Sequence, residues 1–173
     1  MLVVLEGCDG TGKTTLAEDL AKIMDAEIIH CSQCTPNDYT FFHNIIEASK
    51  SMNIIADRFC YGQFVYQDEE KRPLAIKSKG THSVVIGNDV YEFDNGVPAF
   101  KMLHLLETEM LAAGSKVIHV TAPVEEIKER LETRNEILIH NFTVEEVMNR
   151  FHSIFKMSIL PVIKYNTGRY KYE

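Results

Sequence analysis

The sequence predicts an α/β fold in which a five-stranded parallel sheet carries helices on both faces, giving three layers. Short β-branched runs alternate along the chain with longer runs of helical periodicity, the pattern of a parallel sheet built from β–α–β units. A glycine-rich loop directly follows the first apolar run, and turn residues separate the later elements. The 173 residues contain no repeat and no long linker, so we expect one domain over residues 1–173.

The strands are expected where short apolar runs end at turn residues, at 2–6, 27–31, 53–57, 116–121 and 161–166. Helices are expected at 14–24, 40–50, 59–67, 98–113 and 124–134, with a last long helix after Thr143. Asp38 can cap the second helix, and Gly114 stops the fourth. Thr143 and Glu146 have the spacing of a capping box for the last helix.

Residues 81–96 depart from this alternation. Two β-rich arms flank Gly87-Asn88-Asp89, which predicts a β-hairpin. Three roles stay open for it: a cover over a substrate site, a self-association element, or a surface elaboration of the fold.

Composition limits the function classes. Hydrophobic residues make up 45% of the chain and charged residues 25%, as in an ordinary globular protein. The net charge of −7 argues against a general polynucleotide binder, so nucleic acid is not an expected partner. No apolar run approaches the ~20 residues of a membrane span, and no signal-type segment leads the chain. We therefore expect a cytoplasmic protein with no membrane partner.

A CxxC pair, Cys31 and Cys34, lies beside His30. One interpretation is a zinc or redox site. Because there is no second CxxC, the favoured interpretation is reduced, partly buried thiols.

The stretch GCDGTGKTT predicts a phosphate-binding loop. Gly7-x4-Gly12-Lys13-Thr14 fits the pattern G-x-x-x-x-G-K-[ST] in full. Glycines let a ligand approach the main chain closely, and the backbone N–H groups with the following helix N-terminus attract an anion. Lys13 supplies a cation for the β- and γ-phosphates, and Thr14 a hydroxyl for Mg²⁺.

A second candidate site segment is Asp57-Arg58, at the end of the third strand. Ligands in open α/β sheets bind beyond the carboxyl ends of the strands. The Asp57 carboxylate could hold Mg²⁺, directly or through water, or accept a proton from the attacking group. Arg58 could clamp a phosphate with two hydrogen bonds. A surface ion pair or helix cap is the alternative for both residues.

Arg130 and Arg134 are four residues apart and are expected on one helix face. Guanidinium groups there could neutralise charge that builds up during phosphoryl transfer. Glu126, Glu129 and Glu132 lie nearby, so ordinary helix ion pairs are the alternative.

Three stretches resemble thymidylate kinase and its nucleotide-kinase relatives: EGCDGTGKTT, DRFCYGQFVYQ and APVEEIKERLETR. They stand in the family's order and match its EGxDGxGK[ST] loop, its DR-aromatic segment ending in YQ, and its lid helix with spaced arginines. The resemblance implies the P-loop kinase fold, ATP as donor and Mg²⁺. It also implies transfer of the γ-phosphoryl group to a (deoxy)nucleoside monophosphate, a pyrimidine such as dTMP before a purine.

The resemblance also implies roles for individual residues. Lys13, Asp57, Arg58, Arg130 and Arg134 would be catalytic, with Thr14 and Asp57 on Mg²⁺ and a lid at about 123–142. The donor would bind the loop residues Gly7, Asp9, Gly10, Thr11, Gly12, Lys13, Thr14 and Thr15. The acceptor would meet Asp9 through its sugar, Arg58 through its phosphate, and Phe59, Tyr66 and Gln67 near its base.

The departures from the family fall on the acceptor side. CSQCTPND stands where the family has an arginine-containing stretch, the region before Asn53 is shorter, and the 81–96 hairpin has no counterpart. A nucleoside or modified-base kinase, and a nucleotide-binding NTPase without a small-molecule acceptor, therefore stay open. A homodimer is also possible on the sequence alone.

Overall fold

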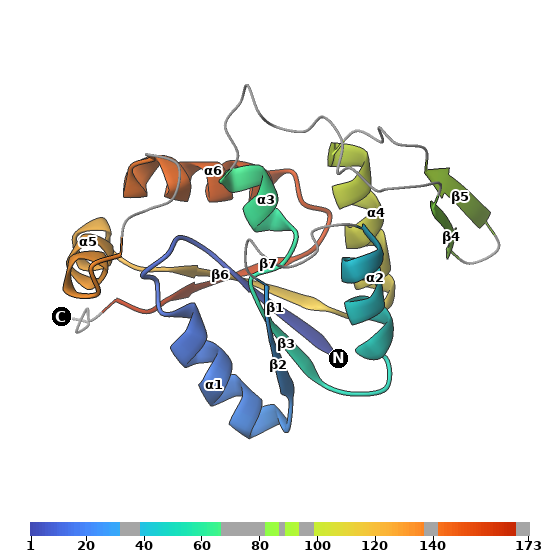
Figure 1. Ribbon diagram of the computed structural model, residues 1–173, viewed down its shortest axis with the longest axis horizontal. Coiled ribbons are helices and arrows are strands. Elements are labelled where there is room, and N and C mark those ends of the chain that lie inside the picture. Colours follow the sequence, from blue (N-terminus) through green and yellow to red (C-terminus); the bar gives the residue numbers. More distant parts are fainter. Residues whose placement is uncertain (32–38, 67–81, 87–88, 94–98, 137–141, 169–173) are drawn as a thin grey trace.

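A computed structural model describes residues 1–31, 39–66, 82–86, 89–93, 99–136 and 142–168. Its main sheet has five strands, all parallel, in the order β2-β3-β1-β6-β7, and the sheet is open (Figure 1). The strands are β1 (Leu2–Glu6), β2 (Glu27–His30), β3 (Ile54–Asp57), β6 (Lys116–Thr121) and β7 (Val162–Asn166). The predicted α/β fold with five parallel strands is confirmed.

The helices follow the predicted alternation with small shifts at their ends. They are α1 (Lys13–Met24), α2 (Tyr39–Ala48), α3 (Tyr61–Val65), α4 (Ala99–Ala112), α5 (Val124–Thr133) and α6 (Val144–Lys156). The capping box of α6 is present: the Glu146 N–H donates to Thr143 Oγ1, and the Thr143 N–H donates to Glu146 Oε2. Gly114 ends α4 with a φ of 68°, as expected for a glycine stop. The cap predicted at Asp38 lies outside the described residues.

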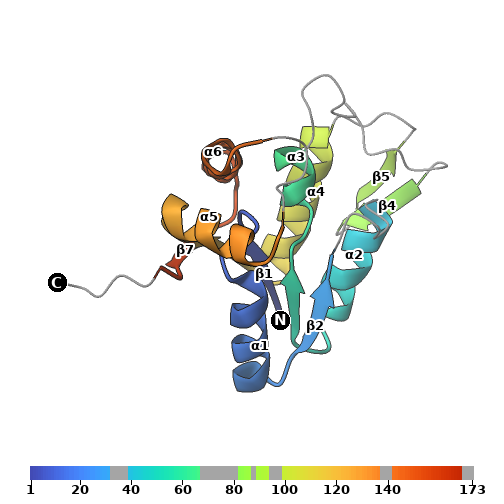
Figure 2. The same cartoon turned by 60° about the vertical axis from the view of Figure 1, so that its left-hand side comes forward.

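Alternate residues of the buried strands enter two separate cores, one on each face of the sheet. Leu2 and Val4 belong to the larger core, which α2, α3, α4, α5 and α6 help to build. Val3 and Leu5 belong to a smaller core with α1. Figures 1 and 2 show α1 on one face and the group α2, α3, α4 and α6 on the other, which is the predicted three-layer arrangement. The alternation follows from the two-residue period of a strand.

The chain connections diverge between the neighbouring strands β1 and β3, because β1 leads to β2 on one side of the sheet and β3 leads toward β6 on the other. In parallel register, Asp57 of β3 lies beside Leu5 of β1 on one side and His30 of β2 on the other. The loop that follows β1 therefore begins at the same edge of the sheet as the β3 end, where ligands of open α/β sheets bind.

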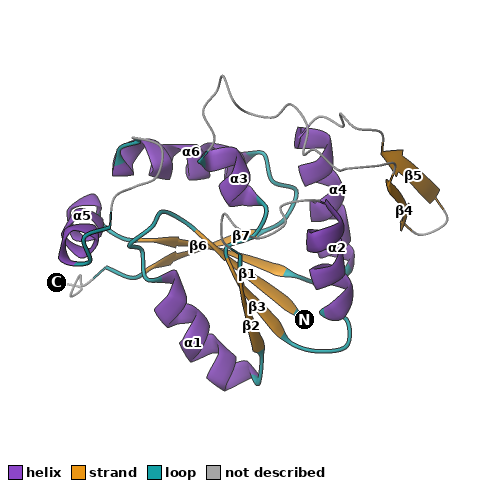
Figure 3. Cartoon of the chain, viewed as in Figure 1, coloured by secondary structure: helices purple, strands orange, loops and turns teal. Residues whose placement is uncertain are grey.

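The predicted hairpin is confirmed. β4 (His82–Ile86) pairs antiparallel with β5 (Asp89–Phe93), with Ile86 opposite Asp89. Figure 3 shows this two-stranded ribbon apart from the main sheet. The turn residues Gly87 and Asn88 lie outside the described residues.

Within the described parts of the chain, no helix has the length and apolar character needed to cross a membrane.

Candidate active site

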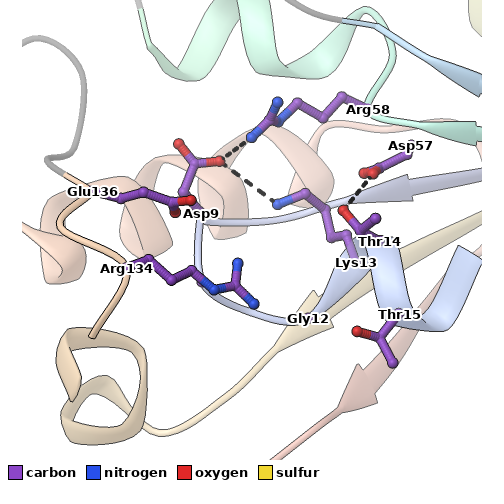
Figure 4. Close-up of a pocket in the computed structure, with 10 residues that line it drawn as sticks. Asp9, Gly12, Lys13, Thr14, Thr15, Asp57, Arg58, Arg134 and Glu136 are labelled. Carbon is purple, nitrogen blue, oxygen red and sulfur yellow. Dashed lines mark hydrogen bonds and ion pairs between the residues drawn. The ribbon is translucent and has the colours of Figure 1, made fainter. Parts of the chain in front are cut away.

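A pocket opens at the carboxyl edge of the sheet, between the loop after β1, the end of β3 and the end of α5 (Figure 4). Charged and hydroxyl side chains and loop glycines form its wall. They are Asp9, Gly10, Gly12, Lys13, Thr14, Thr15, Asp57, Arg58, Arg134 and Glu136. The structure thus brings together most of the residues that the sequence marked for donor and metal binding, and it adds Glu136.

Two glycines are required by close packing of the loop. A Cβ on Gly7 would lie 2.2 Å from the Val120 carbonyl oxygen of β6, far inside contact distance. Gly10 has a φ of 79°, and a Cβ there would lie 3.2 Å from Leu131 and 3.3 Å from Ile127 of α5. The loop is therefore held between β6 and α5, and side chains at these positions would push it out of place.

Thr11 and Arg130 hold the loop from behind and do not line the pocket. Thr11 is buried, and its hydroxyl donates to the Cys8 carbonyl at 2.8 Å. Arg130 donates to the Gly10 carbonyl at 3.1 Å and to the Thr167 carbonyl at 3.2 Å, and it pairs with Glu126 at 3.0 Å. The helix ion pair weighed as the alternative for Arg130 is therefore formed, and its guanidinium braces the loop.

Lys13 begins α1, and its ammonium group lies inside the loop. It donates to the carbonyl oxygens of Gly7 at 2.9 Å and Cys8 at 2.8 Å, and lies 3.9 Å from Asp9 Oδ1. Burial lowers the pKa of Lys13, and the Asp9 carboxylate acts in the opposite direction. The loop thus holds a buried cation at its centre.

Thr14 and Asp57 of the pocket wall form a short polar chain with His30, which lies at the end of β2. Thr14 Oγ1 donates to Asp57 Oδ2 at 2.8 Å, and His30 Nδ1 lies 3.2 Å from the same oxygen. A hydroxyl and a carboxylate oxygen are ligands that suit Mg²⁺, which takes its other ligands from water and phosphates. The residue pair therefore fits the metal that the sequence implied.

The contact of His30 with the Asp57 carboxylate was not predicted from the sequence. The available signal was its place at the end of β2, beside the end of β3 in a parallel sheet.

Arg58 has an unusual backbone and faces the loop. Its φ is 70°, a left-handed value that is uncommon for a residue with a side chain. Its N–H donates to the Leu5 carbonyl at 2.9 Å, and its guanidinium Nη2 donates to Asp9 Oδ1. The backbone turn at Arg58 directs the side chain back over the loop, so the two proposed acceptor contacts, Asp9 and Arg58, meet in this structure.

Glu6, at the end of β1, stabilises the turn at Arg58 by accepting hydrogen bonds from the residues that follow it. Its side chain is 0% exposed, and its Oε1 accepts hydrogen bonds from the N–H groups of Phe59 at 2.8 Å and Gly62 at 3.2 Å. Its other oxygen, Oε2, is buried with no hydrogen-bond partner among the described residues. Burial raises the pKa of Glu6 from 4.5 to about 7, against the lowering effect of the two backbone hydrogen bonds.

Because the pKa of Glu6 is raised in the folded protein, ionisation of Glu6 lowers the free energy of unfolding as pH increases. The folded protein binds the proton more tightly than the unfolded chain between pH 4.5 and about 7, so the Glu6 contribution to stability is lost across that window. His119 contributes the opposite slope, because burial lowers its pKa from 6.5 to about 4. The Glu6 contribution is therefore isolated by comparing the parent with a Glu6→Gln variant, since both retain His119.

We compare the free energy of unfolding of Glu6→Gln with that of the parent at two pH values. The difference in favour of the variant should be larger at about pH 8 than at about pH 5, by ~1.4 kcal/mol for each unit of pKa shift. Denaturant unfolding at the two pH values measures this difference. A constant difference between parent and variant would show that Glu6 does not titrate in this range.

The end of α5 brings Arg134 to the pocket. Arg134 is the C-terminal cap of α5 and lines the pocket, whereas Arg130 lies inside the helix and braces the loop. Arg130 contacts the loop backbone in this structure, and the expected role of both arginines at the triphosphate stays a prediction. Arg134 keeps a helical backbone conformation, and its N–H donates to the Arg130 carbonyl at 3.3 Å, so the two residues stay one helical turn apart.

Of the two aromatic residues expected near the acceptor base, Phe59 lies in the core and Tyr66 is half-buried. Phe59 is 3% exposed and packs against Phe42 with ring centroids 4.6 Å apart, so it belongs to the core and not to the pocket. Tyr66 is half-buried against Phe151, and its hydroxyl has no hydrogen-bond partner among the described residues. Gln67 lies outside the described residues.

The thiols of Cys8, Cys31 and Cys60 are buried and unpaired. Burial raises the pKa of Cys8 and of Cys31 to about 12, so neither thiol is a ready nucleophile at neutral pH. Cys34 lies outside the described residues. In the part of the chain that is described, no group of three or more His, Cys, Asp or Glu side chains could hold a metal ion.

Solved structures share this architecture. The YorR protein from Bacillus subtilis, solved in complex with phosphorylated GDP, matches with a TM-score of 0.67 and 22% identity, over 96% of this chain and 86% of that chain. A deoxyadenosine kinase from M. mycoides with bound dCTP matches with a TM-score of 0.55 and 13% identity, over 96% and 90%. This chain has the fold of P-loop nucleotide kinases.

A thymidylate kinase from Candida albicans also matches, with a TM-score of 0.49 and 15% identity, over 98% of this chain and 84% of that chain. No protein-family model matches the sequence, and no curated protein matches it.

Proposed function

We propose that this protein transfers the γ-phosphoryl group of ATP, with Mg²⁺, to a (deoxy)nucleoside monophosphate, most simply a pyrimidine such as dTMP. The observation that carries the proposal is the meeting of Lys13, Thr14 and Asp57 in one pocket at the end of β1 and β3. A phosphate loop beside a hydroxyl–carboxylate pair is the arrangement that phosphoryl transfer needs, because the reaction depends on positioning and charge stabilisation.

On the donor side, the loop N–H groups and the Lys13 ammonium would bind the β- and γ-phosphates. Bound Mg²⁺ would supply charge neutralisation between these phosphates. Thr14 and Asp57 would hold the metal, and their 2.8 Å hydrogen bond fixes both oxygens on one side of the pocket. Arg134 would neutralise charge on the transferring group from the opposite side, where its guanidinium points toward the loop in Figure 4.

On the acceptor side, Arg58 would bind the acceptor phosphate and Asp9 a sugar hydroxyl. The two side chains are paired with each other here, so an acceptor phosphate would replace Asp9 at the guanidinium and free the carboxylate for the sugar. Arg58 is suited to this because its planar fork matches a phosphate dianion. Tyr66 would lie near the base. The pyrimidine preference rests on the sequence resemblance to thymidylate kinase.

A deoxynucleoside kinase is the second candidate. The Arg58–Asp9 pair supports it, because a guanidinium already neutralised by a carboxylate is a weaker site for an acceptor phosphate. The fold likeness to a deoxyadenosine kinase is consistent with it. A nucleotide-binding NTPase without a small-molecule acceptor is the third reading, and it would need no acceptor-side arginine.

Arg58→Lys is expected to raise the acceptor KM by about tenfold while changing ATP affinity little, because lysine keeps the charge but loses the two-pronged hydrogen bonding. Steady-state kinetics with the acceptor varied at saturating ATP measure the effect, and ATP binding is the internal control. If Arg58→Lys weakens ATP binding and leaves the acceptor KM unchanged, Arg58 serves the donor.

ADP release measured against a panel of nucleosides and nucleoside monophosphates tests the proposal. Release that depends on an added monophosphate is the expected result. Better use of free nucleosides would favour the second candidate, and release that needs no acceptor would favour an NTPase.

A further inference from the structure

Glu136 is a pocket residue that the proposed chemistry does not use. A Schellman-type cap at the end of α5 fixes its position. Asn135 adopts a φ of 52°, its N–H donates to the Glu132 carbonyl at 3.0 Å, and the Glu136 N–H donates to the Leu131 carbonyl at 2.9 Å. These are the two hydrogen bonds that define this cap, with asparagine at the left-handed position.

The cap delivers a cation and an anion to the pocket from a single turn. Arg134 lies just before Asn135 and Glu136 just after it, and both line the pocket. In Figure 4 both side chains extend from the α5 end toward the loop and Asp9. Neither side chain is hydrogen-bonded or ion-paired to another residue among those described, so both charges are available to a ligand.

The ionisable side chains of the pocket cancel in formal charge. Lys13, Arg58 and Arg134 are balanced by Asp9, Asp57 and Glu136. A triphosphate is strongly anionic, and a pocket without net positive charge attracts it only through local contacts. Asp9 is paired with Arg58, and Asp57 accepts a hydrogen bond from Thr14. Glu136 is the pocket carboxylate with no such partner among the described residues.

We propose, on the basis of the proposed nucleotide-binding function, that Glu136 makes the pocket select the magnesium complex of the nucleoside triphosphate over the metal-free nucleotide. Repulsion from a carboxylate grows with the negative charge of the ligand, and Mg²⁺ removes two of those charges. The carboxylate thus penalises the metal-free form more. Metal-free nucleotide, which cannot react, is kept from occupying the site.

The test is equilibrium binding of a β,γ-imido analogue of ATP, measured by calorimetry with excess Mg²⁺ and again with EDTA. The parent is compared with Glu136→Gln, which keeps the side-chain shape and removes the charge. Glu132→Gln is the matched control, because Glu132 is also an exposed glutamate, lies four residues earlier on α5 and does not line the pocket.

We expect Glu136→Gln to tighten binding of the metal-free analogue by about fivefold, the effect of removing ~1 kcal/mol of repulsion. Binding of the magnesium complex should change less than twofold, and Glu132→Gln should match the parent in both conditions. Equal effects of the two variants would overturn the proposal. Weaker binding of the magnesium complex by Glu136→Gln would also overturn it, because the carboxylate would then favour the bound complex. If the parent binds the analogue in neither condition, the proposed function itself fails.

Discussion

Replacing Lys13 by alanine is expected to lower phosphoryl transfer by at least about a hundredfold, and the fold should survive. The Lys13 ammonium is the buried cation at the centre of the loop, 2.8 Å and 2.9 Å from two loop carbonyls. Removing it deletes the charge that would follow the transferring phosphoryl group. Turnover at saturating ATP measures the loss, and circular dichroism with thermal unfolding shows whether the fold is kept.

Lys22→Ala is the matched control for Lys13→Ala. Lys22 lies on the same helix, pairs with Asp19 at 3.8 Å, and has a side chain that is 76% exposed. Its loss should leave turnover unchanged. A folded Lys13→Ala protein with the parent's activity would contradict the assignment of the phosphate-binding loop.

Asp57→Asn should lower turnover by about a hundredfold or more while nucleotide binding stays measurable. The Asp57 carboxylate accepts from Thr14 and lines the pocket with it. The two oxygens would hold Mg²⁺, and a neutral amide is a much poorer ligand for that ion. The variant should also need a higher Mg²⁺ concentration for half-maximal rate. A magnesium titration of turnover measures both effects.

Asp19→Asn, an exposed change on α1, is the control for charge alone. If Asp57→Asn stays within a few-fold of the parent at every Mg²⁺ concentration, the carboxylate has a structural role and the metal site lies elsewhere.

The main features of the fold could be predicted from the sequence because they follow from local patterns. Apolar runs such as residues 2–6 gave the strands, and the spacing of Thr143 and Glu146 gave the start of α6, whose capping box is formed. The loop from Gly7 to Thr15 was found because glycines, lysine and hydroxyls are required there together. Strand order was not predicted, since periodicity does not say which strands pair.

The parts of the site that differ from expectation depend on how elements end. Arg130 binds the Gly10 carbonyl and Glu126, and the left-handed turn at Asn135 brings Glu136 to the pocket. Asparagine tolerates that conformation, so Arg-Asn-Glu after a helical run was the available signal.

Contacts between residues far apart in the chain left no pattern in the sequence from which they could be predicted. Glu6 reaches the N–H groups of Phe59 and Gly62 across more than fifty residues of chain, and nothing in the sequence marks that pairing. The same turn, with Arg58 in a left-handed conformation, is followed by Phe59 in the core and not at the acceptor. Such placements arise from tertiary packing, which single-residue patterns do not encode.

The most direct test of the proposed function follows the γ-phosphoryl group itself. The protein is incubated with Mg²⁺, ATP carrying a radioactive γ-phosphate, and dTMP or another nucleoside monophosphate, and the products are separated by chromatography. We expect the label to appear in the nucleoside diphosphate, with no such product from Lys13→Ala. Label released only as inorganic phosphate, or label left entirely in ATP for every acceptor although ATP binds, would contradict the account.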